Sequence, residues 1–365
     1  MAVYKPTMSD VYLQEFADFV ETFGRVAIPK ELPYCFFVEG GALAVENALK
    51  TAFDWKTRKN WQKGSETEGS MAIHFKQAFH GRSGYTLSLT NTSDPRKYQY
   101  FPLFDWPRII NPKLHFPITE ENLQETIKNE QLALVEIEQA ILMNPDKVSC
   151  IIIEVIQAEG GDNHFRDEFF VELRKICDEN DILLIFDEVQ TGIGITGKMW
   201  AFQNFSVVPD VISFGKKTQV CGILANKEKL NQVEHHVFAE SSRINSTFGG
   251  NFIDMLRFQL VLEIIEKENL LENVQKQGAF LLKGLQNLQE KYPQLISNAR
   301  GKGLMCAFDL PTGEIRKDFQ EKLYEENVII LICGDCSLRF RPHLNVSQED
   351  LQYVLDKIEK IVQKY

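Results

Sequence analysis

The sequence lacks the features of a membrane or exported protein. No apolar run approaches the ~20 residues that span a bilayer, and the start, MAVYKPTMSDVYLQEF, has no apolar segment followed by a small-residue cleavage site. It also lacks an excess of positive charge, because its net charge is -11. Such a chain has no basic surface for nucleic acid and would be repelled by an anionic membrane. We therefore expect neither nucleic acid nor a membrane among its partners.

Cysteine is scarce and follows no pattern. The seven cysteines are odd in number and scattered through 365 residues, which argues against a disulfide framework and for reduced thiols. Cys333 and Cys336 form a C-x-x-C pair, but no second pair or histidine partners accompany them. We expect two incidental thiols there and no metal site. Together with the missing export signal, this predicts a cytoplasmic protein.

Repeats, low-complexity tracts and Pro/Ser-rich linkers are also missing, and the composition is that of an ordinary folded chain, 44% apolar and 25% charged. In the middle of the chain, the apolar runs CIIIEVI (150–156), ILLIFDEV (182–189) and PDVISFG (209–215) are typical of strands buried on both faces. A helical pattern, RDEFFVELRKICDEN (166–180), separates the first two. This alternation predicts parallel βαβ units and an α/β fold, with a mostly parallel sheet flanked by helices.

The pattern changes after Asn251. A long helical region at 255–292 leads to short apolar segments, and a closing helix is predicted to begin at Ser347, with Asp350 as its capping partner. These segments fit a smaller α+β domain of roughly 100 residues. We therefore predict an N-terminal remnant at 1–35, a large α/β domain at 36–255, and a small C-terminal α+β domain with its connecting helix at 256–365.

One stretch, LLIFDEVQTGIGITGKMW (183–200), fits two kinds of site. An apolar strand ending in Asp187 resembles the magnesium-binding strand of an ATPase, and the G-x-x-x-x-G-K pattern that ends at Lys198 nearly matches a phosphate-binding loop. Such a loop needs Ser or Thr after its lysine, where this chain has Met199. In those enzymes the loop and the acidic residue also follow different strands. We therefore reject a nucleotide hydrolase.

Asp187 instead fits a cofactor with a pyridine ring. Ligands bind at the carboxyl ends of strands in open α/β sheets, and pyridoxal phosphate works as an electron sink while a carboxylate keeps its ring nitrogen protonated. This hypothesis also demands a lysine at a neighbouring strand end, an anion site at a helix start and an aromatic ring. Lys216 and Lys217 follow the next strand. Only one of them can face a pocket, because adjacent side chains of an extended segment point apart.

The other two demands are met earlier in the chain. Gly41 and Ala42 stand at a helix start with free backbone N–H groups, and Phe79 offers a ring close to Arg82, a cation for a carboxylate. Each feature alone has a plainer interpretation: Gly-Gly as a turn, Phe79 as core, a strand-end lysine as a solvated side chain. Their joint appearance favours a pyridoxal 5′-phosphate site.

At these residues the sequence resembles the class III, fold-type I pyridoxal-phosphate aminotransferases, from about Ser9 to the C-terminus. The resemblance lies in FFVEGGALAVENALK, in FHGRSGYTLSLTNT with FPLFDWPRI downstream, and in FGKKTQVCG. The wider class has Gly-Lys-Ala and a glycine cluster at the last of these, so the Lys-Lys-Thr-Gln-Val-Cys form indicates the L-lysine 6-aminotransferase subgroup. The resemblance implies a fold-type I architecture and a pyridoxal 5′-phosphate cofactor.

The resemblance also implies roles for single residues around the cofactor. Lys216 becomes the Schiff-base and catalytic lysine, which leaves Lys217 facing away. Thr247 matches a residue that reaches the phosphate of the neighbouring subunit, which implies a homodimer; within one chain it also suits a Ser/Thr turn before a Gly-Gly pair. The remaining expected contacts are Asp187 at the pyridine nitrogen, Gln190 near the phenolic oxygen, Gly41 and Ala42 at the phosphate, and Phe79 against the ring.

Substrate contacts follow from the same resemblance. Arg82 is expected to hold the α-carboxylate of lysine, and Arg339 the α-carboxylate of 2-oxoglutarate, since guanidinium groups bind carboxylates bidentately. Glu159 matches a glutamate that pairs with Arg339 while lysine occupies the site and releases it for the keto acid. Arg341 is the alternative to Arg339, and a simple loop carboxylate is the alternative for Glu159.

The implied reaction transfers the ε-amino group of L-lysine to 2-oxoglutarate, giving 2-aminoadipate 6-semialdehyde and glutamate, with Lys216 as general base. Two alternatives stay open. One is another class III ω-aminotransferase, of the ornithine or 4-aminobutyrate type. The other is an inactive homologue that still binds the cofactor, because family members carry a further N-terminal segment before the region matching KPTMSDVY, almost where this sequence opens.

Overall fold

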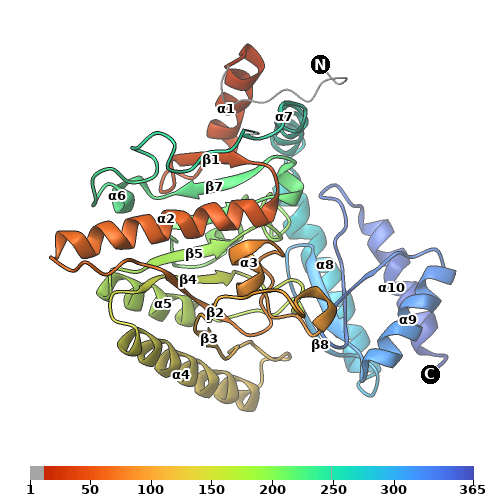
Figure 1. Ribbon diagram of the computed structural model, residues 1–365. Coiled ribbons are helices and arrows are strands. Elements are labelled where there is room, and N and C mark those ends of the chain that lie inside the picture. Colours follow the sequence, from red (N-terminus) through yellow and green to blue (C-terminus); the bar gives the residue numbers. More distant parts are fainter. Residues whose placement is uncertain (1–11, 248) are drawn as a thin grey trace.

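A computed structural model gives the structure of residues 12–247 and 249–365. Two β-sheets organise the chain, a seven-stranded sheet and a four-stranded sheet beside it (Figure 1). The expected start of the family resemblance at Ser9, and the part of the predicted N-terminal remnant before Tyr12, lie outside the described residues. No helix in the two described ranges is long and apolar enough to cross a membrane.

The large sheet is mostly parallel, as the sequence predicted. Its strand order is β1-β7-β6-β5-β4-β2-β3; β7 runs antiparallel to both of its neighbours, and the other pairs are parallel. All residues of β4, β5 and β6 are buried. The strands are β1 (Tyr34–Val38), β2 (Met71–Phe75), β3 (Arg108–Ile109), β4 (Val148–Glu154), β5 (Leu183–Asp187), β6 (Val211–Phe214) and β7 (Cys221–Ala225).

Alternating side chains attach helices to the two faces of this sheet. Ile151 and Ile153 of β4 belong to one core, whereas Ile152 belongs to the core on the opposite face, because successive side chains of a strand point to opposite sides. The second core contains α2 (Gly41–Gln62), which crosses the near face in Figure 1. The first core contains α1 (Gln14–Val26), α4 (Glu120–Met143), α5 (Asp167–Glu179) and α7 (Phe252–Lys267).

The register of the parallel strands sets three polar side chains side by side. Glu154 at the end of β4 is paired with Asp187 at the end of β5, and Asp187 is paired with Ser213 in β6. The carboxyl ends of parallel strands meet at one edge of a sheet, where a ligand can approach them. The polar residues at or near the ends of these strands therefore lie together at one edge of the sheet.

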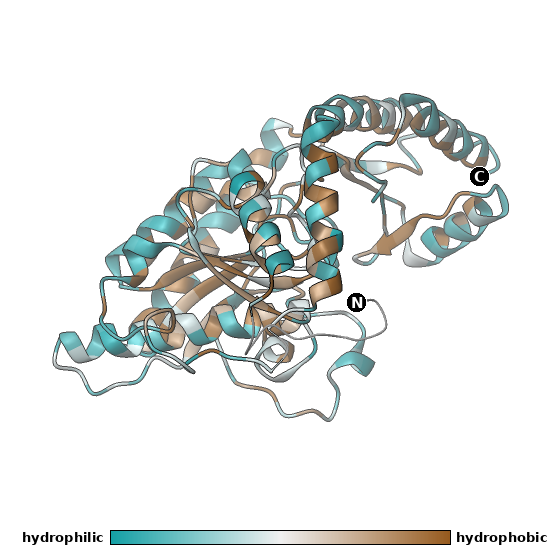
Figure 2. Ribbon diagram, turned by 90° about the horizontal axis from the view of Figure 1, so that it is seen from above, coloured by the Kyte–Doolittle hydropathy of each residue, from teal (hydrophilic) through white to brown (hydrophobic). Residues whose placement is uncertain are grey.

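The smaller part of the chain is an antiparallel sheet of order β10-β11-β9-β8 packed against helices. Figure 2 shows it as a second lobe beside the apolar strands of the large sheet. The strands are β8 (Ser297–Lys302), β9 (Met305–Asp309), β10 (Leu331–Cys333) and β11 (Ser337–Arg339). The helices are α8 (Leu270–Lys291), α9 (Gly313–Glu325) and α10 (Gln348–Val362).

Two helix predictions in this part had different outcomes. The predicted capping box is confirmed, because α10 begins after Ser347 and the side chains of Ser347 and Asp350 cap each other's backbone N–H groups. The helical region predicted at 255–292 is two helices, because Asn269, with a φ of 50°, takes a left-handed conformation between α7 and α8. Short helices α3 (Gly84–Leu89) and α6 (Lys227–Leu230) complete the α-helices of the described residues. The boundaries predicted after residues 35 and 255 stay predictions.

Candidate active site

The buried end of β5 holds a hydrogen-bonded aspartate. Asp187 Oδ2 lies 2.8 Å from His80 Nδ1, and Oδ1 accepts from Ser213 Oγ at 3.1 Å and from the Val189 N–H at 3.0 Å. Asp187 is only 4% exposed, and a carboxylate buried this deeply requires such partners. His80 Nε2 is itself buried with no hydrogen-bond partner among the described residues. The aspartate is therefore held in one orientation, next to a polar atom that a ligand can satisfy.

A second acid, Glu154, ends the neighbouring strand β4. It is 2% exposed and accepts hydrogen bonds from the Phe79 N–H at 2.8 Å and the Ala158 N–H at 3.0 Å. Burial raises the pKa of Glu154 to about 7, and the nearby Asp187 adds to the shift. Glu154 was not predicted from the sequence. It stands inside the apolar run CIIIEVI, and only the structure shows that the strand ends there.

The strand ends open into a cavity of about 290 Å3. Most of the predicted site residues line it: Gly41, Ala42, Phe79, Arg82, Glu159, Asp187, Gln190 and Lys216. The other lining residues had no predicted role: His80, Gly81, Glu154 and Val189. The two predicted residues that lie outside this lining are Thr247 and Arg339.

The first turn of α2 forms a wall of the cavity that suits an anion. Its N-cap residue Gly40, with a φ of 99°, has no side chain to accept from the first N–H groups of the helix. A Cβ added at Gly41 would lie 3.1 Å from Val189 Cγ1, so glycine lets this turn pack closely against the loop that follows β5. Uncapped N–H groups and the helix dipole together favour a bound phosphate at such a helix start.

Lys216 and Lys217 point to different places. Lys216 lines the cavity, and its φ of 55° puts it in the left-handed region, where a residue with a side chain is strained. The Nζ of Lys217 donates to the backbone oxygen of Gln190, and burial lowers the pKa of Lys217 to about 7. The structure therefore places Lys216, and not Lys217, on the cavity wall.

Glu159 stands at the rim of the cavity and pairs with a lysine that the sequence analysis did not consider. Lys97 Nζ lies 2.6 Å from Glu159 Oε1, and Thr92 Oγ1 donates to the same oxygen at 3.2 Å. Lys97 ends a short 3-10 helix, Pro95–Lys97. No pattern in the sequence marks it, because it reaches the site from a loop. The predicted pairing of Glu159 with Arg339 while lysine is bound stays a prediction.

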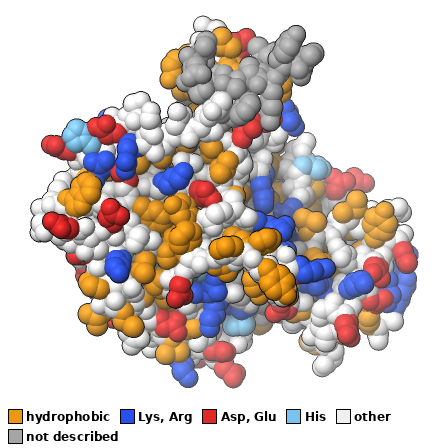
Figure 3. Space-filling view, viewed as in Figure 1, with side chains coloured by type: hydrophobic (Ala, Val, Ile, Leu, Met, Phe, Trp, Pro, Cys, Tyr) orange, Lys and Arg blue, Asp and Glu red, His pale blue; other side chains and the backbone are white. Residues whose placement is uncertain are grey.

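The two candidate arginines, one at the end of β11 and one just after it, differ in their partners. Arg341 forms a bidentate ion pair with the fully buried Asp162, with Nη1–Oδ2 and Nη2–Oδ1 distances of 2.8 and 2.5 Å, and only its Nε is buried without a partner among the described residues. Arg339 has no such ion pair, and both its Nε and its Nη1 are buried without a partner among the described residues. A buried guanidinium without a partner is costly. Arg339 is therefore the arginine that a ligand carboxylate would satisfy, and Lys and Arg side chains gather where the two lobes meet (Figure 3).

The glycine loop after β5 cannot act as a phosphate-binding loop. The N–H groups of Gly192, Gly194 and Gly197 donate to the backbone oxygens of Glu188, Met199 and Gly194 at 2.9, 3.2 and 2.8 Å. A phosphate cradle needs such N–H groups to be available. The structure thus agrees with rejecting the nucleotide hydrolase.

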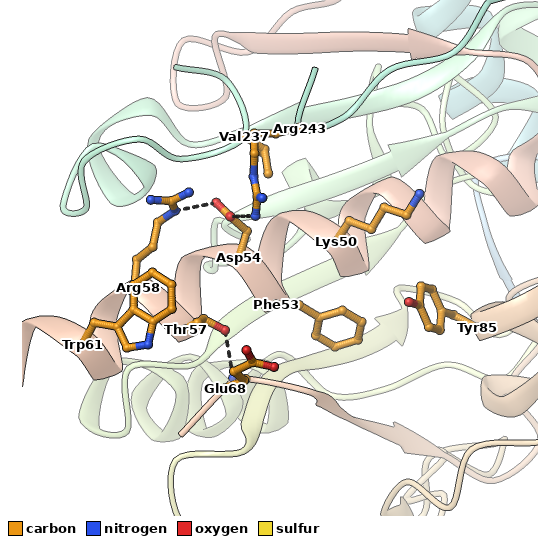
Figure 4. Close-up of a pocket in the computed structure, with 11 residues that line it drawn as sticks. Lys50, Phe53, Asp54, Thr57, Arg58, Trp61, Glu68, Tyr85, Val237 and Arg243 are labelled. Carbon is orange, nitrogen blue, oxygen red and sulfur yellow. Dashed lines mark hydrogen bonds and ion pairs between the residues drawn. The ribbon is translucent and has the colours of Figure 1, made fainter. Parts of the chain in front are cut away.

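Thr247 is exposed and is not among the residues that line the cavity of its own chain. In the segment before it, Arg243 reaches α2 and pairs with Asp54, which also accepts from Arg58 Nε at 3.0 Å (Figure 4). A hollow of about 460 Å3 runs along this face of α2. Its buried acid is already neutralised by two arginines, and it contains none of the predicted site residues, so we assign the chemistry to the cavity at the strand ends.

That cavity fits pyridoxal 5′-phosphate. The uncapped start of α2 suits a phosphate, Asp187 suits a protonated ring nitrogen, and the Lys216 amine suits an aldehyde. Phe79 presents an aromatic ring at the same cavity. Among residues 12–247 and 249–365, no group of three or more His, Cys, Asp or Glu side chains could hold a metal ion.

Comparisons with known proteins agree with this chemistry. The chain is 49% identical over 351 residues to the L-lysine-epsilon aminotransferase of Mycobacterium tuberculosis, a match that covers 96% of this chain and 77% of that protein. It is 34% identical over 364 residues to the mitochondrial 4-aminobutyrate aminotransferase of Homo sapiens, with coverages of 94% and 71%. A solved structure of lysine aminotransferase from M. tuberculosis in the internal aldimine form superposes with a TM-score of 0.96 at 47% identity, covering 100% of this chain and 82% of that one.

The family model for class III aminotransferases spans almost all of the sequence, from residue 8 to residue 362. Enzymes of this class depend on pyridoxal phosphate, and the lobes, strand order and cavity described above are those of fold type I. The chain belongs to the class III aminotransferases, the pyridoxal-phosphate-dependent transferases of fold type I.

Proposed function

We propose that this chain transfers the ε-amino group of L-lysine to 2-oxoglutarate, yielding 2-aminoadipate 6-semialdehyde and glutamate. The cavity is the observation that carries the proposal, because it brings Lys216, Asp187 and Arg82 into one space. The mycobacterial relative named for lysine supports lysine as the amino donor, at 49% identity. The relative named for 4-aminobutyrate is more distant, at 34%.

The cofactor side of the cavity holds pyridoxal phosphate. The N–H groups of Gly41 and Ala42 bind the phosphate, Asp187 pairs with the ring nitrogen, and Phe79 stacks on the ring. Gln190 hydrogen-bonds near the phenolic oxygen. When bound, pyridoxal phosphate supplies an electron sink for the negative charge that develops on the reacting carbon.

Lys216 moves the proton. Its Nζ removes a proton from the ε-carbon of lysine and acts in the opposite sense when the keto acid is aminated. Arg82 fixes the α-carboxylate of lysine through bidentate hydrogen bonds, and this orientation presents the ε-carbon rather than the α-carbon to Lys216. Placement of the reacting carbon beside the base can lower the barrier by up to ~7–11 kcal/mol.

Two substrates of different charge use the same site. Arg339 binds the α-carboxylate of 2-oxoglutarate, which gives its buried Nε and Nη1 the partners they lack in this structure. With lysine bound, Glu159 pairs with Arg339 and neutralises it. The exchange requires a glutamate that can change partners, and Glu159 stands at the cavity rim on a loop.

The active unit is a homodimer in which Thr247 reaches the phosphate of the neighbouring subunit. Its exposed position, outside the cavity of its own chain, supports a role across an interface. The molecular mass in solution, measured by light scattering, should be twice the 42.0 kDa of the chain. A mass of 42.0 kDa in the presence of cofactor would contradict the dimer and this role of Thr247.

The seven cysteines are all unpaired, which supports a reducing compartment and therefore a cytoplasmic enzyme.

The amino donor is tested by measuring glutamate formed from 2-oxoglutarate with L-lysine, ornithine or 4-aminobutyrate at equal concentration. We expect kcat/KM for lysine to exceed the others by about 10-fold or more, since a difference of one methylene in a substrate is worth ~10–200-fold. An equal or faster rate with another donor would move the proposal to that ω-amine. Glutamate from none of the donors would favour an inactive homologue that only binds the cofactor.

A further inference from the structure

Glu159 contacts Lys97 through its side chain and the β10–β11 turn through its backbone. On one side, Lys97 Nζ lies 2.6 Å from Glu159 Oε1, and the same ammonium donates to Thr92 Oγ1 at 3.3 Å. On the other side, the Gly334 N–H donates to the backbone oxygen of Glu159 at 2.8 Å. This bond ties Glu159 to the β10–β11 hairpin, which ends in Arg339.

The ion pair is partly shielded from water. The Lys97 and Glu159 side chains are 27% and 28% exposed, and Lys97 Nζ lies 5.7 Å from the centre of the Phe79 ring. Lys97 and Glu159 also line a groove of about 730 Å3 that reaches the turn after β10, and Glu159 lines the cofactor cavity as well. Lys97 therefore neutralises Glu159 where the groove and the cofactor cavity meet.

In the proposed function, the partner of Glu159 decides whether Arg339 is free to bind a substrate carboxylate. In this structure Glu159 is bonded to Lys97 and Thr92, and two buried nitrogens of Arg339 have no partner among the described residues. We propose that Lys97 is a specificity-determining residue that holds the Glu159 carboxylate and so leaves Arg339 available for the carboxylate of a dicarboxylic keto acid. The inference rests on the proposed function and adds to it the cation that receives Glu159 in the second half-reaction.

Charge explains why such a cation is needed. When Arg339 releases Glu159, an uncompensated carboxylate at the cavity mouth would repel an incoming dicarboxylate. Pairing with Lys97 removes this repulsion without closing the cavity. Lysine does not need this help, because its α-carboxylate is assigned to Arg82. Lys97 should therefore affect the keto acid and not the amino donor.

The direct test is calorimetric titration of the cofactor-loaded full chain with glutarate, a dicarboxylate that has no keto group and cannot react. Lys97→Met should weaken glutarate binding about 5-fold, the effect expected of one partly shielded ion pair, and Lys97→Arg should restore it. Arg96→Met is the matched control, because Arg96 is the adjacent cation, is 86% exposed and pairs with Asp94. It should change binding by less than about 2-fold.

The double variant Lys97→Met with Glu159→Gln shows whether Lys97 acts through Glu159. Removing the unpaired carboxylate should recover most of the lost glutarate affinity, as coupled residues behave in a double-mutant cycle. No recovery would overturn the proposal. Equal losses in Lys97→Met and Arg96→Met would also overturn it, because the effect would then be general charge. The proposal would also be overturned if the protein without substitutions did not bind glutarate.

Steady-state kinetics separate this inference from the proposed function. Lys97→Met should raise the KM for 2-oxoglutarate about 5-fold while the KM for lysine and kcat stay unchanged. If the unchanged enzyme uses lysine but Lys97→Met binds glutarate normally, only the role of Lys97 fails. If the unchanged chain binds glutarate in a Lys97-dependent way but does not use lysine, the proposed donor fails and the role of Lys97 stands.

Discussion

The two sides of the cavity are built in different ways. On the cofactor side, Glu154, Asp187 and Ser213 lie on adjacent parallel strands, are almost fully buried and have assigned hydrogen-bond partners. On the substrate side, Arg82 and Glu159 lie on loops, where Arg82 is exposed and Glu159 is partly exposed. The sheet fixes one side before any ligand binds, whereas the other side presents charges whose partners can change.

This difference matches two tasks. A cofactor that stays through both half-reactions needs fixed hydrogen-bond partners, because rigid elements hold catalytic groups most accurately. Two substrates of unlike charge need a side that can be rearranged. Changes on the strand side should therefore alter cofactor binding and protonation, and changes on the loop side should alter the KM of one substrate.

The largest effect is expected at the two adjacent lysines. Lys216→Ala should lower kcat by more than about 10^3-fold, since a general base alone contributes ~10^2–10^4-fold. Lys217→Ala is the matched control, because the Lys217 side chain bonds to the backbone oxygen of Gln190 and does not line the cavity. Borohydride reduction followed by peptide mass spectrometry should find the cofactor on Lys216 in the unchanged protein and in Lys217→Ala. Label on Lys217 would reverse the assignment.

The titration of Glu154 tests whether the strand side of the cavity excludes water, as the burial of Glu154 indicates. Because the folded-state pKa is about 7 and the ordinary value is 4.5, the unfolded chain loses this proton first as pH rises. The free energy of unfolding should therefore fall between these two pH values, by about 3 kcal/mol, and stay level above them. Glu154→Gln should lack this fall. Urea unfolding of both proteins should show that the difference between their free energies of unfolding changes by this amount across the range; a constant difference would mean that Glu154 titrates as if exposed.

Arg82 tests the loop side. Arg82→Met should raise the KM for lysine about 10- to 100-fold, because hydrogen bonds to charged groups contribute ~1.5–3 kcal/mol. The dissociation constant of pyridoxal phosphate should change little, since Arg82 is assigned to the substrate. Both constants are measured on the same preparation. If Arg82→Met weakened cofactor binding by the same factor as it raised the KM for lysine, the cofactor side and the substrate side would not be separate.

Ser213 gives the smallest and most selective effect. Ser213→Ala removes one donor to Asp187 and leaves the bonds from His80 and Val189. Cofactor affinity should fall about 3- to 10-fold, because a typical hydrogen bond contributes a net ~0.5–1.5 kcal/mol and two other bonds still hold Asp187, and the KM for lysine should not change. A change in the KM for lysine without a change in cofactor affinity would contradict the assignment of the strand side to the cofactor and the loop side to the substrate.

The same contrast decides what could be predicted from the sequence. Asp187 could be found because an uninterrupted apolar run implies a buried strand, and parallel strands present their ends to ligands. Glu154 was harder to find, because the apolar run continues through Val155 and Ile156 and so does not mark where the strand ends. Lys97 could not be found, because a loop lysine has no periodic signal. The ion pair that occupies Arg341 could not be found from the sequence either, since its partner Asp162 is far away along the chain.

The most direct test of the account is the visible absorbance of the cofactor-loaded protein, recorded after adding L-lysine alone and then 2-oxoglutarate. We predict that the band of bound pyridoxal phosphate disappears with lysine and returns with the keto acid, with one glutamate formed per site. A band that ignores lysine, or that responds only to a different amine, would contradict the claim that this cavity accepts the ε-amine of lysine.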